Sequence, residues 1–234
     1  MAVKRETRDI FRHAAPFATW IALQAVLPAT AWAYAVRTVV TALVGVWCLW
    51  RGGSRSCATA TPSHLGEAAL SPLRLFIGLL IGVLVTILWI APEFSTFYRT
   101  WFCWPIGSIP TVSPAPSPYE PAVCGWALTA AKLVGSAFVI APVEEVFFRS
   151  FLYRWLQKRD FLSVPLSRFN LSAFLWMVFL FTLEHDRPLA AAVAGALYGF
   201  AAIRWGLPSA IAAHVTTNLL LAVYVIHQNA WAFW

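Results

Sequence analysis

Two adjacent glutamates, Glu144 and Glu145, lie in one of the most apolar stretches of the chain. An ionised side chain in the middle of a bilayer costs roughly 2.5–3.5 kcal/mol on insertion scales, so such groups are usually paired or functional. Glu145 and Arg149 are four residues apart, a spacing that predicts an ion pair on one helix face. Glu144 lies about 100° away around the helix and is therefore free to act as a general base. The alternative is a buried network in which both glutamates only neutralise Arg149.

Two further pairs of residues show the same spacing of four. Phe181 precedes His185, and His214 precedes Asn218. On a helix each pair shares a face, and the second pair can direct two donors at one oxygen atom. For both histidines the alternative is a packing residue that hydrogen-bonds within a helix bundle. Glu144, His185 and His214 together are also a chemically allowed set of metal ligands.

These residues lie in a chain whose composition indicates a polytopic membrane protein. It has 234 residues, of which 60% are hydrophobic and only 12% charged, with a mean hydropathy of +0.68. Soluble domains carry about 25% charged residues, and a spanning helix needs about 20 apolar residues. The sequence therefore predicts an all-α fold with about seven transmembrane helices, within a range of six to eight. The predicted spans are 15–33, 35–50, 73–91, 126–157, 170–185, 189–205 and 207–226.

The fourth span is unusually long and contains Pro142. Because proline removes a backbone donor and kinks helices, this span is either one tilted helix or two pieces broken at Pro142. We predict a single membrane domain in which residues 1–125 supply N-terminal helices and a proline-rich loop. Residues 126–234 supply the catalytic helical core. The segments 51–72 and 92–125 are predicted to be loops.

Helix geometry tests whether the polar residues can meet. At 1.5 Å per residue, Glu144 and His185 lie about 20 Å and 24 Å from the turn that joins their helices. His214 lies only about 10 Å beyond the turn that precedes its own helix. A shared site therefore requires helix tilt or a kink at Pro208.

Basic residues predict the orientation of the chain. The net charge is +7, and the bases gather in residues 4–12, 51–74 and 154–168. With seven spans, all three segments lie on the cytoplasmic side. Because they form no patch on a soluble surface, we exclude nucleic-acid binding. The four cysteines show no metal-binding pattern. Cys103 and Cys124 flank the proline-rich loop and are either a disulfide or two unrelated residues.

Taken together, the three motifs resemble the CAAX-processing and bacteriocin-processing membrane proteases (the CPBP or Abi family). These are glutamic intramembrane proteases related to type II CAAX prenyl endopeptidases. The chain has, in the family's order, Glu-Glu-x-x-x-Arg at 144–149, Phe-x-x-x-His at 181–185 and His-x-x-x-Asn at 214–218. The runs 195–199 and 204–209 also look like the family, so the resemblance covers about residues 135–220. One departure is Ser150, where many relatives have glycine.

The resemblance implies roles for these residues. Glu144 would activate water, and His185 would help to bind or orient it. His214 and Asn218 would stabilise the oxyanion of a tetrahedral intermediate, an effect often worth about 3–4 kcal/mol per donor. No cofactor is implied, and a zinc-dependent version of the same protease is the alternative. Structural support would come from Glu145, Arg149 and Phe181.

A narrower resemblance implies a location and partners. Glu184-His185, residues 213–225 and the final Trp-Ala-Phe-Trp look like the CAAX prenyl protease-related proteins of bacterial exosortase systems. Those systems handle proteins with a short C-terminal sorting signal. The expected location is the lipid bilayer of the bacterial cytoplasmic (inner) membrane, as a multi-pass protein. The expected partners are a membrane-anchored or membrane-proximal protein or peptide substrate and an exosortase-type sorting system.

The predicted function is an intramembrane endopeptidase that hydrolyses a peptide bond in or near the membrane with glutamate-activated water. No serine or cysteine accompanies a base at suitable spacing, which disfavours serine-type intramembrane proteolysis. Two other function classes stay open. One is a non-catalytic membrane scaffold in which the polar residues only hold helices together. The other is a small-ion or proton transporter, because membrane carboxylates and histidines also form relays.

Overall fold

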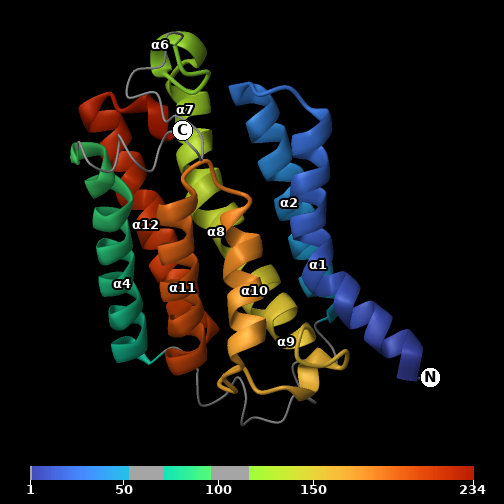
Figure 1. The fold of residues 1–234 in the computed structure, drawn as a ribbon. Coiled ribbons are helices and arrows are strands. Elements are labelled where there is room, and N and C mark those ends of the chain that lie inside the picture. The colour runs from blue at the N-terminus through green and yellow to red at the C-terminus, as the bar shows by residue number, and fades with distance from the viewer. Residues whose placement is uncertain (1, 53–70, 96–115) are drawn as a thin grey trace.

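The computed structural model describes residues 2–52, 71–95 and 116–234, and these residues contain helices and no strand (Figure 1). The predicted all-α fold is confirmed. The longer helices are α1 (Ala2–Val26), α2 (Ala31–Gly52), α4 (Pro72–Ile90), α10 (Leu171–Thr182), α11 (Pro188–Trp205) and α12 (Leu207–Gln228). Single helical turns are Ala91–Phe94, α6 (Pro121–Cys124), Phe161–Ser163 and Trp231–Phe233.

The central segment from Trp126 to Trp155 is one continuous helical run and is not broken at Pro142. Its parts are α7 (Trp126–Gly135), a π-helical turn (Ser136–Ile140), α8 (Ala141–Glu145), a second π-helical stretch (Val146–Leu152) and α9 (Tyr153–Trp155). Pro142 lies in the first turn of α8, directly after the π-helical turn. Isolated π-helical turns occur frequently at functional sites. Here they flank Glu144 and Glu145 on both sides.

Five helices of the described residues are long and apolar enough to cross a membrane, which confirms a polytopic membrane protein. They are Ala31–Trp50, Pro72–Ile90, Trp126–Trp155, Pro188–Trp205 and Leu207–Gln228. Each matches a predicted span within a few residues.

The other two predicted spans differ from the structure. α1 runs from Ala2 to Val26, so the basic segment 4–12 is helical, and the predicted span 15–33 crosses a bend at residues 27–30. That bend contains Pro28, which cannot continue the helical hydrogen bonds. α10 has only 12 residues, about 18 Å at 1.5 Å per residue, which is less than a bilayer core. It ends before His185.

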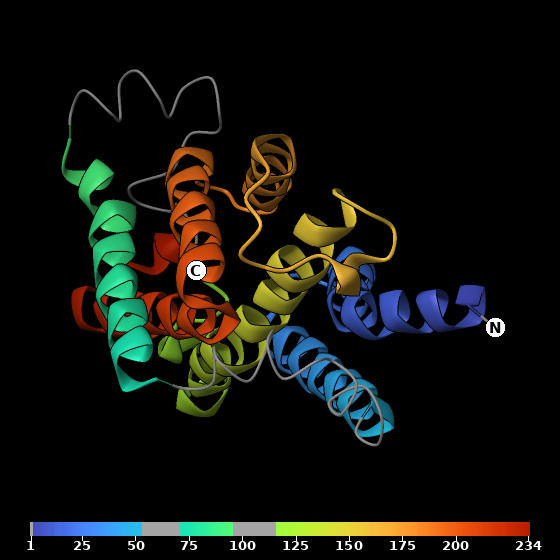
Figure 2. The same cartoon turned by 90° about the horizontal axis from the view of Figure 1, so that it is seen from below.

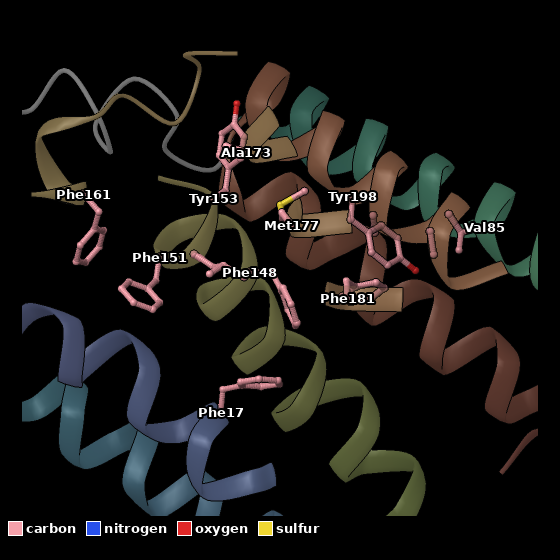
Figure 3. Close-up of a cluster of buried hydrophobic side chains, with 13 residues drawn as sticks. Phe17, Val85, Phe148, Phe151, Tyr153, Phe161, Ala173, Met177, Phe181 and Tyr198 are labelled. Atoms are coloured by element: carbon pink, nitrogen blue, oxygen red, sulfur yellow. The ribbon is translucent and has the colours of Figure 1, made fainter. Parts of the chain in front are cut away.

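The helices pack on both sides of the central run. Figure 2 shows α1 and α2 on one side and α4, α11 and α12 on the other. The largest core cluster joins these groups, and it includes Phe17 of α1, Phe148, Phe181 of α10 and Tyr198 of α11 (Figure 3). The rings of Phe148 and Phe181 meet edge to face at 5.3 Å between centroids.

The turns alternate between two ends of the molecule (Figure 1). The N-terminus, the start of α4, residues 156–170 and the α11–α12 turn lie at one end, and the turn 183–187 and α6 lie at the other. The predicted cytoplasmic segments that the structure describes therefore share an end. Most of the two predicted loops, and Cys103 with them, lies outside the described residues. Cys124 forms no disulfide within them.

Candidate active site

Glu145 lies at the centre of a buried polar network. Its Oε1 forms an ion pair with Arg149 Nη1 at 3.1 Å and accepts a hydrogen bond from His214 Nδ1 at 2.9 Å. All three residues are buried, with 0%, 1% and 5% of their surface exposed. Because a carboxylate only accepts, the hydrogen of this bond belongs to His214 Nδ1. Glu145 therefore pairs with Arg149, as the spacing predicts. Its second partner is His214 of α12.

Arg149 connects the central helix to two neighbouring helices. Its Nη2 donates to the carbonyl oxygen of Gly195 in α11 at 3.2 Å. The guanidinium also lies over the ring of Phe181 in α10, 4.5 Å from its centroid. A Cβ on Gly195 would come within 2.9 Å of that ring, so the small residue allows α11 to approach. Arg149 therefore holds three helices at fixed positions around the glutamates.

Glu144 lies against the opposite edge of the same imidazole. Its Oε2 is 3.9 Å from His214 Nε2, and this buried oxygen has no hydrogen-bond partner among the described residues. The spacing of the two glutamates predicts different directions for their side chains. The structure places them at the two nitrogens of His214. Glu145 is hydrogen-bonded to Nδ1, and Glu144 Oε2 lies near Nε2 without a hydrogen bond.

His185 lies in the turn that follows α10. The prediction that it shares a helical face with Phe181 is wrong in detail, because α10 ends at Thr182. The two rings still meet at 4.5 Å between centroids, and His185 Nδ1 donates to the Phe181 carbonyl oxygen at 2.9 Å. This bond leaves Nε2 as the nitrogen available for other partners. The Phe181 ring also contacts His214, at 6.0 Å, so both histidines border one aromatic ring.

Asn218 lies one turn beyond His214 on α12. Its Nδ2 donates to the carbonyl oxygen of Ser136 at 2.9 Å, in the π-helical turn that precedes α8. One of its two N–H groups therefore ties α12 to the central helix. The predicted oxyanion role would use the other N–H and stays a prediction.

Two residues that the sequence analysis did not single out support His214. The ring of Tyr198 stacks on the imidazole at 4.7 Å and 21°. Its hydroxyl donates to Thr217 Oγ1 at 2.7 Å, and Thr217 Oγ1 donates in turn to the carbonyl oxygen of Gly82 in α4, at 3.1 Å. Their signals in the sequence were weak, because tyrosine and threonine are common in apolar helices. Tyr198 lies in the run 195–199, and Thr217 lies inside the His-x-x-x-Asn motif.

A metal site is the alternative that the sequence left open. Within the part of the chain that the structure describes, no group of three or more His, Cys, Asp or Glu side chains converges enough to hold a metal ion. Glu144, His185 and His214 all lie within the described residues, and a zinc-dependent version of the protease stays a prediction that a chelator test must decide.

Residues 126–220 match the family of type II CAAX prenyl endopeptidase Rce1-like proteins. The match covers less than half of the chain, but it includes every residue of the network around Glu145 except those of α4. It supports a multi-pass membrane protease of the CAAX family. No curated protein and no solved structure matches the chain.

Proposed function

We propose that this chain is a glutamic-type intramembrane endopeptidase in which Glu144 activates the attacking water. The observation that carries the proposal is the asymmetry of the glutamate pair. Glu145 Oε1 pairs with Arg149 and accepts a hydrogen bond from His214 Nδ1, whereas Glu144 Oε2 lies 3.9 Å from Nε2 of the same imidazole and is buried without a hydrogen-bond partner. The match of residues 126–220 to CAAX endopeptidases supports peptide-bond hydrolysis as the reaction.

In the proposed reaction Glu144 takes a proton from water while the water oxygen bonds to the carbonyl carbon of the substrate. The carbonyl oxygen becomes the oxyanion of a tetrahedral intermediate. Glu144 then gives its proton to the amide nitrogen, the C–N bond breaks, and a carboxylic acid and an amine leave. No nucleophilic serine or cysteine is needed. Proton transfer by a positioned side chain typically contributes 10²–10⁴-fold to such reactions.

His214 would stabilise the oxyanion through Nε2. Because Nδ1–H is already donated to Glu145, Nε2 carries a hydrogen only when the imidazole is positively charged. The stacked ring of Tyr198 fixes the plane of the imidazole. His185 would bind or orient the water with its own Nε2.

The proposed setting is the bacterial cytoplasmic membrane, with a membrane-anchored or membrane-proximal protein as the substrate. The likeness of residues 213–225 and of the segment Trp231–Trp234 to exosortase-associated proteins supports a sorting system as the source of substrates. The reaction needs no metal, because Glu144 would supply the base and His214 the electrophile.

The test compares purified wild type with Glu144→Gln in detergent. Both are incubated with a library of membrane-proximal peptides, with and without a chelator, and products are read by mass spectrometry. Glu6→Gln is the matched control, because Glu6 lies near the start of α1, outside the site. We expect cleavage by wild type and Glu6→Gln, none by Glu144→Gln, and no effect of the chelator.

The outcomes separate the alternatives. Cleavage retained in a folded Glu144→Gln protein would exclude Glu144 as the base. Activity lost with chelator and restored by zinc would support the metal-dependent protease. Full biological function of Glu144→Gln in cells would support the scaffold.

A further inference from the structure

Arg187 joins the turn that carries His185 to residues 230–234. It is only 5% exposed and lies two residues after His185, at the N-cap of α11. Its Nη2 donates to the carbonyl oxygen of Ala232 at 3.3 Å, and its guanidinium carbon lies 3.8 Å from the ring centroid of Phe233. Carbonyl oxygens and aromatic rings both attract a guanidinium. One side chain therefore connects two segments that lie 45 residues apart in the sequence.

Residues 230–234, here called the return segment, are themselves fixed on the bundle. Asn229 follows α12 in the left-handed conformation, with φ at 52°, and turns the chain back. The ring of Phe233 then meets that of Tyr224 of α12 edge to face, at 5.7 Å between centroids. Trp234 packs against the buried cluster that contains residues of α1, α2 and the central helix. The return segment is therefore a fixed partner for Arg187.

Weak backbone hydrogen bonds hold the turn 183–187. The N–H groups of residues 183–185 donate at 3.2–3.4 Å, which is longer than the usual N–O distance of about 2.9–3.0 Å. Directly after the turn, Pro188 has no N–H to donate. The position of the turn therefore depends strongly on side-chain contacts, and the contact of Arg187 with the return segment lies at its end.

The direction of the His185 ring depends on the position of this turn. The imidazole lies between the rings of Phe181 and Trp89, with centroids at 4.5 Å and 5.6 Å. Its Nδ1 donates to the Phe181 carbonyl oxygen at 2.9 Å, and this bond directs Nε2 away from that carbonyl. A shift of the turn by about 1 Å would break the bond, and a displacement of that size can lower a reaction rate about 100-fold.

We propose that Arg187 is a positioning residue for His185, and that it acts by binding the turn 183–187 to the return segment. The inference rests on the proposed function, which assigns the attacking water to His185 Nε2. Arg187 itself touches neither the water nor the peptide. The return segment lies outside residues 126–220, so the family match does not include this contact. Residues 230–234 are then a working part of the active site.

The first test observes the His185 ring without any cleavage. The chain has five histidines, and the nitrogen NMR spectrum of histidine-labelled protein in detergent shows which ring nitrogen carries the hydrogen. The His185 signal is the one that disappears in His185→Gln. At about pH 8, where an ordinary imidazole is neutral, we expect only the Nδ1–H form in wild type. Arg187→Met should give a mixture of the Nδ1–H and Nε2–H forms. Arg187→Lys should stay closer to wild type, because an ammonium also binds rings and carbonyl oxygens.

Phe233→Leu tests the other side of the contact. If Arg187 acts through the return segment, Phe233→Leu should change the His185 spectrum in the same direction. Because both substitutions break one contact, the double variant should add little to Arg187→Met. Arg204→Met, at an exposed residue of the same helix α11, is the matched control and should leave the spectrum unchanged.

Peptide cleavage by the same preparations is the second readout. Arg187→Met should lower kcat about tenfold or more and change KM less than about twofold, because His185 acts on the water and not on the peptide. A raised KM with unchanged kcat would instead mean that Arg187 contacts the substrate, and it would overturn the positioning role.

Two results of the NMR test would also overturn the proposal. One is an unchanged His185 spectrum in Arg187→Met protein whose thermal unfolding shows that it is folded. The other is full additivity of Arg187→Met and Phe233→Leu. If Arg187→Met does not fold, Phe233→Leu and Arg187→Lys decide by the same spectrum. A wild type that cleaves no peptide would count against the proposed function, whereas the spectrum would still decide the role of Arg187.

Discussion

At the scale of single residues, the site depends on one buried carboxylate, Glu145, that contacts two partners at once. Glu145 Oε1 contacts both Arg149 and His214, so removal of either leaves a buried carboxylate with one partner fewer. Burying two charges is costly, and the cost is offset only while each has its partners. We therefore expect loss of either partner to destabilise the protein, whatever chemistry Glu144 performs.

Arg149→Met should destabilise the protein by about 3–5 kcal/mol, because it leaves Glu145 buried without its guanidinium. It also removes the bond to Gly195 and the contact with Phe181. Denaturant unfolding in mixed micelles measures the change. The exposed Arg204→Met is the control, with an expected change within about 0.5 kcal/mol. Equal stability of the two variants would contradict a structural role for the pair.

Tyr198→Phe should lose about 0.5–1.5 kcal/mol, because the hydroxyl bond to Thr217 is removed while the ring still stacks on His214. Tyr198→Leu removes the stack as well, and should lower the cleavage rate more than Tyr198→Phe does. Unfolding and peptide cleavage are measured on the same preparations. A cleavage rate that is the same in both variants would show that the stacked ring does not position His214.

The sequence was a good guide to contacts within one helix and a poor one to contacts between helices. Spacing of four predicted the Glu145–Arg149 partners, because helix geometry alone determines that distance. His214 as the second partner of Glu145 depends on how α12 crosses the central helix, which no local pattern encodes.

At the scale of elements, close helix contacts bring His214 to the glutamates. The estimated depth of His214 was about 10 Å less than that of Glu144, yet the structure joins it to Glu145 at 2.9 Å. α12 is tilted against the central helix (Figures 1 and 2) and lies on α4 along a row of small residues. Helix spans could be predicted from apolar runs, but tilt depends on which small residues face which neighbour.

Gly82→Ala should therefore disturb the site by changing the contact between α4 and α12. An added Cβ would be 2.5 Å from the Ala213 carbonyl oxygen and 2.6 Å from Thr216 Cβ, so α4 and α12 must move apart. We expect a loss of about 1–3 kcal/mol, as for other overpacked contacts, together with slower cleavage because α12 carries His214. Thermal unfolding and peptide cleavage measure the two effects.

Gly45→Ala in α2 is the matched control for that substitution. A Cβ there meets nothing within 4 Å, so the change should be neutral or stabilise the helix by about 0.5–1 kcal/mol. Similar losses in the two variants would mean that backbone propensity, and not the α4–α12 contact, determines the result.

At the scale of the whole molecule, the alternation of helices separates two chemically different ends. Of the seven predicted spans, five correspond to described helices that are long and apolar enough to cross a membrane. The other two do not, because α1 carries charges in its first half and α10 is short. The alternation of the turns is nevertheless kept, since α1 and α10 still run between the two ends (Figure 1). Basic residues such as Arg74, Lys158 and Arg204 share one end, and the His185 turn lies at the other.

The positive-inside rule predicts that the end with Lys158 faces the cytoplasm and the C-terminal end of α12 faces the other side. Lys158→Cys and Gln228→Cys, both at exposed positions, test this in a protein whose native cysteines are replaced. A membrane-impermeant maleimide should label Lys158→Cys in inverted vesicles and Gln228→Cys in right-side-out vesicles. Labelling of both from one side would contradict the topology.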